Sequence, residues 1–228
     1  MSAPQEAAQK ATWPTTPTLE GALSRCVARA TPVRTIIDIG ASNAQWSRIA
    51  VRHYPNARFH LLEAKPLHKP GLDAFVAENP RASYELAAVS DSVGSTWFYP
   101  SDDPWGGHVS GERVDGAVEM KMTSIDAEVE NHALEPPFFL KFDTHGHESQ
   151  ILAGATRTLE RTSLIIMEVY NFRHEPYFAE RTLQLADLGF RCVDLCDPMY
   201  RSRDGALWQM DLVYARNDDP TFQSSDYA

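Results

Sequence analysis

The chain of 228 residues lacks the features by which several protein classes are identified. It carries a formal net charge of −10 and contains no run of lysine or arginine. Because binding to phosphates needs a basic footprint, this charge argues against nucleic acid and against an anionic membrane surface as partners. The balance favours a small ligand that is neutral or positively charged.

Cysteines and long apolar segments are also scarce. The three cysteines, Cys26, Cys192 and Cys196, show no C-x-x-C spacing, so they predict neither a disulfide framework nor a zinc site. No segment approaches the roughly 20 apolar residues that a transmembrane helix requires, and the first residues lack the apolar core of a secretory signal. We therefore expect a cytoplasmic protein without a membrane span.

What the chain does contain is an alternation of strands and helices. Short apolar runs predict strands at 35–40, 58–64, 83–90, 138–143 and 163–170, and amphipathic stretches predict helices at 19–30, 42–53, 67–78, 148–161 and 176–188. Residues 190–195 and 207–216 are expected to pair as an antiparallel hairpin. This order predicts an α/β fold, with a seven-stranded, mostly parallel, doubly wound sheet that ends in an antiparallel C-terminal hairpin.

Two regions fall outside this alternation. Residues 1–17, with prolines at 4, 14 and 17, are expected to form a mobile lead-in to a single domain of residues 18–228. Residues 94–122 contain two strand-like runs around a turn-rich segment that includes Trp105 and His108. We expect an inserted loop region in which these two residues contact the substrate, although an ordinary surface loop fits the same residues.

Acidic or small polar residues stand at the end of each predicted parallel strand. In an open parallel sheet, ligands lie outside the carboxyl ends of the strands, where the strand order reverses. These ends are formed by residues 38–43, Glu63, 89–91, 143–148, and Glu168 with Tyr170. We expect the ligands at this edge, with Glu168 and Tyr170 as contacts to the substrate.

The loop after the first strand differs from a loop that binds phosphates. A dinucleotide-binding loop needs G-x-G-x-x-G, whereas here Asp38 precedes a single Gly40, and Ala44 stands in the place of a third glycine. An acid at this position repels phosphate but suits a cationic ligand such as S-adenosylmethionine, which carries a sulfonium and an α-ammonium group. The alternative is a tight turn in which Asp38 serves only as a partner of the helix end.

Glu63 extends the same hypothesis. It stands 23 residues after Gly40, near the spacing of about 20 residues at which an acid accepts the hydroxyls of a ribose in this kind of sheet. The alternative is a solvated acid at a strand end. Together with Asp38, Glu63 favours an adenosine cofactor.

The segment 140–155 gathers Lys141, Asp143 and two histidines around one strand-to-helix turn. Asp143, His145 or His147 can act as the base that takes a proton from a substrate hydroxyl. Asp143 and Glu168 can instead hold a divalent metal through their oxygens. The plainer interpretation is that Asp143 caps the helix and Lys141 forms a surface ion pair.

These stretches match a known family. The chain resembles the FkbM-like methyltransferase family, within the class I, Rossmann-like S-adenosylmethionine enzymes, over residues 33–216. The resemblance rests on IDIGASNAQWS (37–47), LEAKP (62–66), AAVSD (87–91), TSID (123–126), LKFDTHGHE (140–148), LAGA (152–155), IMEV (166–169), GF (189–190) and QMD (209–211).

The resemblance implies S-adenosylmethionine as cofactor and O-methylation of a hydroxyl group on a sugar, a glycolipid or polysaccharide precursor, or a natural product. The acceptor is then a small molecule or a carbohydrate. The implied contacts are Asp38, Gly40 and Ala41, with Ser42 of the same loop, to the methionine part; Glu63 to the ribose; Ala88, Val89 and Ser90 near the adenine; and Asp143 beside the transferable methyl group. Magnesium at Asp143 and Glu168, and assembly into a homo-oligomer, stay open.

Three positions depart from the family pattern, and two other functions stay open. Ala44 replaces a usual glycine, and His145 and His147 stand where the family more often has glutamine and tyrosine, so neither histidine inherits a role. Both are candidates for a base or a substrate contact particular to this chain.

An NAD-dependent oxidoreductase is disfavoured by the missing glycine motif, and a catalytically silent, methyltransferase-like binding module is suggested only by Ala44.

Overall fold

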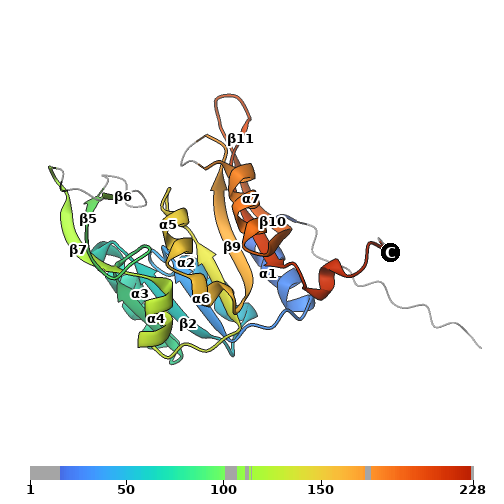
Figure 1. The fold of residues 1–228 in the computed structure, drawn as a ribbon, viewed down its shortest axis with the longest axis horizontal. Helices are drawn as coiled ribbons and strands as arrows, with labels where there is room; N and C mark the ends of the chain where they lie inside the picture. Colours follow the sequence, from blue (N-terminus) through green and yellow to red (C-terminus); the bar gives the residue numbers. More distant parts are fainter. Residues whose placement is uncertain (1–15, 101–106, 111–112, 114, 173–175, 227–228) are drawn as a thin grey trace, which may run out of the picture.

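Seven strands form one mostly parallel sheet, as predicted. A computed structural model describes residues 16–100, 107–110, 113, 115–172 and 176–226. The strands of this sheet are β1 (Thr35–Ile39), β2 (Arg58–Glu63), β3 (Ala82–Leu86), β8 (Phe138–Phe142), β9 (Thr162–Tyr170), β10 (Phe190–Tyr200) and β11 (Leu207–Arg216). Their order is β10-β11-β9-β8-β1-β2-β3, and β11 is the strand that runs antiparallel to both of its neighbours (Figure 1). The predicted α/β class and C-terminal hairpin are therefore confirmed.

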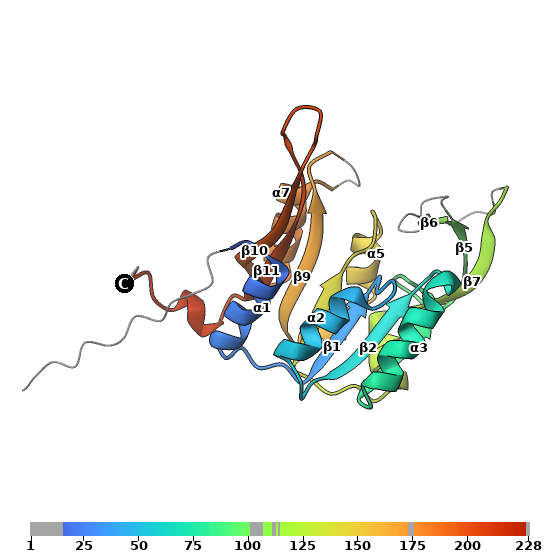
Figure 2. The same cartoon turned by 180° about the vertical axis from the view of Figure 1, so that it is seen from behind.

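Helices cover both faces of this sheet. One face is covered by α1 (Leu19–Ala28), α2 (Gln45–His53) and α3 (Lys69–Glu78), and the other by α4 (Ile125–Asn131), α5 (Glu148–Ala153), α6 (Thr156–Leu159) and α7 (Phe178–Asp187) (Figures 1 and 2). Each residue of β1 and β8 is buried, because successive side chains of a covered strand enter the cores on opposite faces. Ile36 packs among residues of α1, α2 and α3, whereas Ile37 packs among residues of α4, α5 and α7.

A second sheet explains one wrong prediction. Residues 83–90 were expected to form a single strand, but the chain leaves β3 at Leu86 and continues as β4 (Ala88–Val89), which pairs with β7 (Val118–Thr123). The order of the second sheet is β4-β7-β5-β6, with β5 (Gly94–Pro100) and β6 (Gly107–Ser110). The described part of residues 94–122 is therefore largely antiparallel sheet, and its two strand-like runs lie in β5 and β7.

The helix expected at 148–161 is interrupted. It divides into α5 and α6 around Gly154 because the Gly154 carbonyl accepts a hydrogen bond from the Asp126 amide of α4 at 3.0 Å. The carboxylate of Asp126 in turn accepts hydrogen bonds from the amides of Arg157 and Thr158 at the start of α6. A side chain at Gly154 would also meet the carbonyl oxygen of Ser90, 2.2 Å from the position of its Cβ. Tertiary contacts therefore override the continuous helical pattern.

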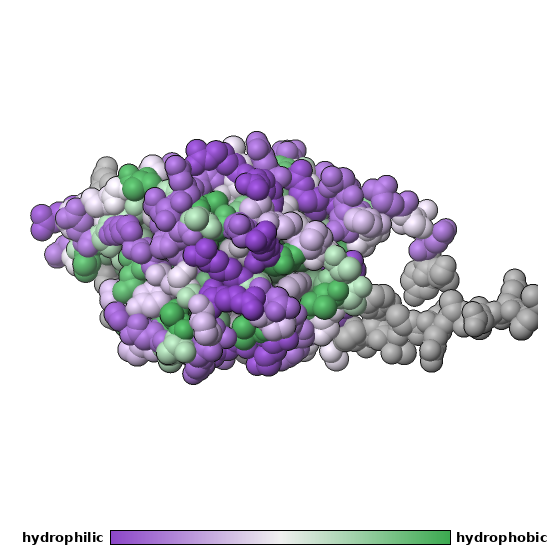
Figure 3. Space-filling model, turned by 90° about the horizontal axis from the view of Figure 1, so that it is seen from below, coloured by the Kyte–Doolittle hydropathy of each residue, from purple (hydrophilic) through white to green (hydrophobic). Residues whose placement is uncertain are grey.

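Among the described residues, no helix has the length and apolar character needed to cross a membrane. The face in Figure 3, seen from below relative to Figure 1, carries mostly hydrophilic side chains with small, separate apolar areas. Scattered apolar residues of this kind are ordinary on a folded protein surface.

A buried ion pair holds the turn after β8 against α7. Nη2 of Arg181 donates to Oε2 of Glu148 at 2.9 Å, and the two side chains are only 3% and 7% exposed. The other carboxylate oxygen of Glu148 accepts hydrogen bonds from the Gly146 amide at 3.0 Å and from the Thr144 hydroxyl at 3.2 Å. Glu148 therefore links the start of α5, the turn and α7.

Replacing Arg181 with methionine would leave the Glu148 carboxylate buried without its cation. Because removal of one partner of a buried pair typically costs about 3–5 kcal/mol, we expect Arg181→Met to lower the free energy of unfolding, measured by urea denaturation, by about 3 kcal/mol. Arg34→Met is the control, since it removes an exposed pair with Glu135 and should cost less than about 1 kcal/mol. Equal small losses in the two variants would contradict the role given to the buried pair.

Candidate functional site

The loops after β1 and β8 meet at the point where the strand order reverses. β1 is flanked by β2 on one side and by β8 on the other, which is where open parallel sheets bind ligands. Gly40 has a φ of +78°, and a Cβ there would lie 2.0 Å from the carbonyl oxygen of Asp143. Only glycine fits this position, because the left-handed backbone and the close approach both exclude a side chain.

The loop that follows Gly40 repeats the left-handed conformation at two residues that are not glycine. Ser42 has a φ of 49° and Ala44 a φ of 64°. Ala44 is completely buried and forms the N-cap of α2 without a side-chain hydrogen bond to the helix. Ala44 therefore takes the conformation that glycine would favour, at a cost of about 1–2 kcal/mol. The amides of the first turn of α2 face this loop with their positive dipole end.

Glu63 fixes the loop through its carboxylate. Oε2 accepts a hydrogen bond from the Ser42 amide and Oε1 accepts one from the Lys65 amide, each at 2.7 Å. The residue is 7% exposed. A carboxylate oxygen accepts more than one hydrogen bond, so Glu63 can hold the backbone and still accept from ligand hydroxyls.

Asp38 is buried beneath the same loop. Oδ2 accepts a hydrogen bond from the Ser47 hydroxyl of α2 at 2.6 Å. Oδ1 has no hydrogen-bond donor among the described residues, and the Lys141 ammonium lies 3.8 Å away. Burial raises the pKa of Asp38, against the opposing effect of Lys141. An unsatisfied buried carboxylate oxygen of this kind suits a cationic donor from a ligand.

Lys141 joins the two acids that flank the reversal point. The plainer interpretation of the sequence placed it in a surface ion pair, but it is 3% exposed, because β8 is buried on both faces. Nζ donates to Oδ2 of Asp143 at 2.6 Å. Although burial opposes the charged form of each group, the Lys141 ammonium holds the pKa of Asp143 below its usual value. Asp143 is therefore ionised, and its carboxylate is fixed in direction.

A second group of side chains lies beyond Asp143. His145 Nδ1 is 2.9 Å from the Tyr170 hydroxyl, and that hydroxyl donates to Oε2 of Glu168. Gln209 of β11 donates to the other oxygen of Glu168. Burial, and then the negative charge of Asp143, raise the pKa of Glu168 to about 8. This carboxyl therefore changes its charge within the pH range at which proteins normally work.

The two histidines of the turn are separated by the structure. Ligand atoms of Asp143, His145 and Glu168 all lie within 4.8 Å of one another, whereas Nε2 of His147 lies 3.0 Å from the Ser90 hydroxyl. Burial lowers the pKa of His147. The buried residues Ala88 and Val89 form β4, immediately before Ser90. His147 therefore belongs to the side of the site where the adenine contacts were expected.

Several residues near Glu168 carried no role in the sequence analysis. Asp211 lies directly opposite Glu168 in the pairing of β9 with β11, and burial raises its pKa to about 7. Gln209 and Asp211 had entered only as part of a motif, since nothing in the local pattern shows that β11 inserts beside β9. Of the other substrate candidates, Trp105 lies outside the described residues, and His108 belongs to β6, where it pairs with Tyr99.

An open pocket lies at the tip of the β10–β11 hairpin. It is lined by Tyr200, Arg201, Ser202, Arg203 and Trp208. The ring of Trp208 stacks on Phe172 with ring centroids 5.9 Å apart, and the Arg201 guanidinium lies 3.8 Å above the Phe172 ring. Phe172 follows Tyr170 by two residues, and Figure 2 shows the hairpin projecting beyond the end of β9. The pocket therefore lies on the same edge of the sheet as Glu168.

Comparisons with known proteins agree with this arrangement. A family profile described as the methyltransferase FkbM domain matches residues 38–192, while a search of curated proteins found no match. Among solved structures, the chain is similar to 1,6-didemethyltoxoflavin-N1-methyltransferase of Burkholderia thailandensis, solved with S-adenosylhomocysteine, at 12% identity and a TM-score of 0.51, with 88% of this chain and 78% of that chain covered. It is also similar to a candidate tRNA (m1A22) methyltransferase of Streptococcus pneumoniae, at 12% identity and a TM-score of 0.50, with coverages of 86% and 69%. The chain belongs to the FkbM methyltransferase family and is an S-adenosylmethionine-dependent methyltransferase with the class I fold.

Proposed function

We propose that the protein transfers a methyl group to a hydroxyl of a sugar, a sugar-bearing lipid or polysaccharide precursor, or a natural product. The observation that carries this proposal is the pair of groups on either side of Asp143. Asp38 and Glu63 supply carboxylates for the cofactor, and His145, Tyr170 and Glu168 form a chain suited to removing a proton from the acceptor. When bound, S-adenosylmethionine supplies an electrophilic methyl group on its sulfonium.

The cofactor side is assigned from charge and hydrogen-bonding capacity. Oδ1 of Asp38 accepts the ammonium group of the methionine part, near Gly40, Ala41 and Ser42, and the first-turn amides of α2 receive its carboxylate. Glu63 accepts the ribose hydroxyls. The adenine lies near Ala88, Val89 and Ser90, with His147 holding the Ser90 hydroxyl in place.

The acceptor side requires a base next to Asp143. The Tyr170 hydroxyl donates to Glu168, so Nδ1–H of His145 donates to the Tyr170 oxygen, and Nε2 of His145 carries the lone pair that takes the proton. Asp143 is a weak base because Lys141 lowers its pKa. It instead accepts a hydrogen bond from the acceptor hydroxyl and orients it.

The class of acceptor is inferred from the hairpin pocket and the total charge. Trp208 and Tyr200 line the pocket with aromatic rings of the kind that pack against the C–H faces of sugars, and Arg201 can donate to ring hydroxyls. A net charge of −10 opposes a polyanionic acceptor such as RNA. In a methylation assay with both classes of acceptor, transfer to RNA but to none of the sugars or glycosides would contradict this assignment.

A magnesium ion fits the acidic cluster poorly. One of the three grouped donors is an imidazole, whereas Mg²⁺ prefers an all-oxygen octahedral site. The Lys141 ammonium already lies 2.6 Å from Asp143 and would repel a second cation there. The roles given to Asp143 and Glu168 therefore contain no metal.

Glu63→Gln should weaken binding of S-adenosylmethionine by about 10-fold or more, because hydrogen bonds to a charged acceptor contribute about 1.5–3 kcal/mol. Isothermal titration calorimetry measures the affinity. Glu135→Gln is the matched control, since Glu135 is exposed and pairs with Arg34. Unchanged affinity in Glu63→Gln would remove Glu63 from the cofactor site.

His145→Ala should lower kcat by about 10²–10⁴-fold, the usual contribution of a general base, with little change in cofactor affinity. Added imidazole should restore part of the activity. His53→Ala, which alters an exposed pair with Glu20, should retain full activity. If His145→Ala keeps its kcat while Asp143→Asn loses it, Asp143 is the base instead.

Glu168→Gln should change both the stability and the activity of the protein, and the size of each change should depend on pH. The pKa of Glu168 is raised to about 8 in the folded protein, so the native state holds a proton that the unfolded state releases. Stability is therefore lost as pH rises from the unfolded value toward about 8. We expect the melting temperature of the variant to increase relative to that of the wild type as pH rises from 5 to about 8. Its kcat should be lower than the wild-type value and should lack the rise with pH that we expect for the wild type. A difference in melting temperature that is constant with pH would contradict the assigned pKa.

A further inference from the structure

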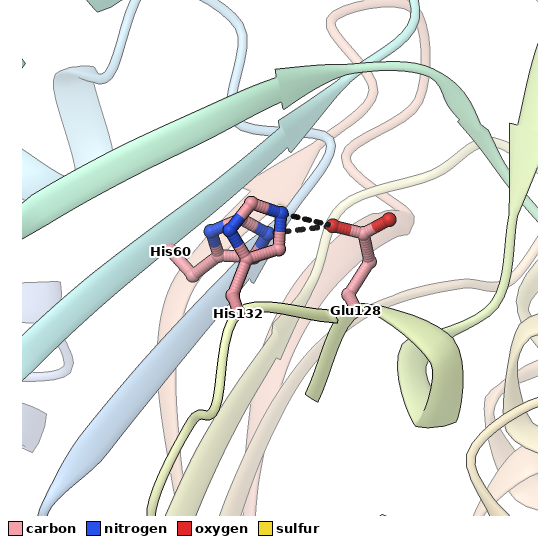
Figure 4. Close-up of side chains that lie close together, drawn as sticks. All are labelled: His60, Glu128 and His132. Carbon is pink, nitrogen blue, oxygen red and sulfur yellow. Dashed lines mark hydrogen bonds and ion pairs between the residues drawn. The ribbon is translucent and has the colours of Figure 1, made fainter. Parts of the chain in front are cut away.

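A second group of ligand-type side chains lies on the other face of β2, away from the methyl-transfer site. His60 of β2 and His132 at the end of α4 both direct Nε2 to the same carboxylate oxygen, Oε2 of Glu128, at 2.9 Å and 3.2 Å (Figure 4). Glu128 and His132 are four residues apart and share one face of α4. We infer that His60, Glu128 and His132 form a binding site for a transition-metal cation of the zinc class.

The donor atoms and their spacing match such a cation. Two imidazole nitrogens and one carboxylate oxygen are a ligand set that Zn²⁺ uses with an open fourth position. In a tetrahedral site with bonds of about 2.0–2.1 Å, neighbouring ligand atoms are about 3.3 Å apart. The two separations that involve Glu128 Oε2 are 2.9 Å and 3.2 Å, and the three ligand atoms all lie within 4.8 Å of one another.

The surrounding hydrogen bonds already orient the ligands. Nδ1 of His60 lies 2.9 Å from the Ser83 hydroxyl of β3, and the Thr123 hydroxyl donates to Oε1 of Glu128 at 2.6 Å. Metal-binding histidines and carboxylates commonly have such outer partners, which fix the ring orientation and the tautomer. The atoms that remain directed at one another are the three that would bind the cation.

The charge balance also favours a cation. The side chains of His60 and Glu128 are 0% and 1% exposed, and a buried carboxylate is costly unless a positive charge accompanies it. Among the described residues, the ion pairs of Glu128 involve only His60 and His132, and an imidazole supplies a positive charge only when it is protonated. The His132 side chain is 31% exposed, so a cation and a water ligand can reach the fourth position from solvent.

The position of the site indicates how a bound cation would act on the fold. His60 precedes Glu63 by three residues, which is about 10 Å along a strand, and α4 follows directly from β7 of the second sheet. A cation bound to one residue of β2 and two of α4 would fasten the second sheet and α4 to the strand that carries Glu63. The site is separate from the acceptor base at His145 and does not depend on the proposed function.

The test uses the full chain after EDTA treatment and removal of the chelator. Zn²⁺ titration should show saturable binding and raise the melting temperature, and Co²⁺ should give the visible absorption of a site with nitrogen and oxygen ligands. His132→Ala should reduce Zn²⁺ affinity by more than about 10-fold. Loss of a residue that only orients a ligand already costs about 10-fold or more, and His132 is itself a ligand in this site. Because His132 is partly exposed at a helix end, this variant should fold, which circular dichroism and urea unfolding verify.

Matched variants distinguish this site from other histidines. His53→Ala removes a partly buried histidine paired with Glu20 and should bind Zn²⁺ as the wild type does, and so should His145→Ala. Glu128→Gln should lose binding in the same way as His132→Ala. If the wild type takes up no Zn²⁺, or if His132→Ala and Glu128→Gln bind it with wild-type affinity, the inference is wrong and the cluster is a hydrogen-bond network alone.

Discussion

The buried ammonium of Lys141 is the constraint on which the site depends. It lies between Asp38 at the end of β1 and Asp143 after β8, 3.8 Å and 2.6 Å from their nearest carboxylate oxygens. Without it, two carboxylates would stand close together in a region from which water is largely excluded, where like charges strongly oppose each other. The ammonium allows both acids to occupy the point where strand order reverses, and it fixes the direction of the Asp143 carboxylate.

The rest of the site contains backbone conformations and buried polar groups that are unfavourable by themselves and that the surrounding structure holds in place. Ser42 and Ala44 have left-handed backbones, Oδ1 of Asp38 lacks a donor, and Glu168 is buried with a pKa near that of a catalytic base. Each of these features costs stability in the absence of ligand. They lie at the carboxyl edge of the sheet, while the compensating core of apolar side chains lies between the sheet and its two helical layers.

β2 connects the two regions for which we propose a function. Glu63 at its end accepts a hydrogen bond from Ser42 in the loop after β1, and His60 within it contacts Glu128 of α4. Alternation of side chains along the strand sends these residues to different neighbours. The same strand also begins the path to the second sheet, since the Ala87 amide donates to the carbonyl of Glu63.

The sequence by itself determined the order of the main elements, the antiparallel hairpin and the acids at the strand ends. The reason is that apolar runs and helical stripes of this length are set by local periodicity, and a strand such as Thr35–Ile39 is apolar because both its faces are covered. Local patterns also identified Asp38, Gly40 and Glu63 at the positions where the family resemblance implies contacts to the cofactor.

The tertiary structure alone decided which of these residues meet. It separated His145 from His147, buried Lys141, and divided residues 83–90 between two sheets. It also brought His60 to Glu128 and His132, although the spacing of the cysteines had predicted no zinc site and only the last two share a helix face. A contact between residues 57 positions apart in the sequence, such as Ser90 and His147, depends on how the helices and sheets pack together. The periodicity of a single segment does not determine that packing.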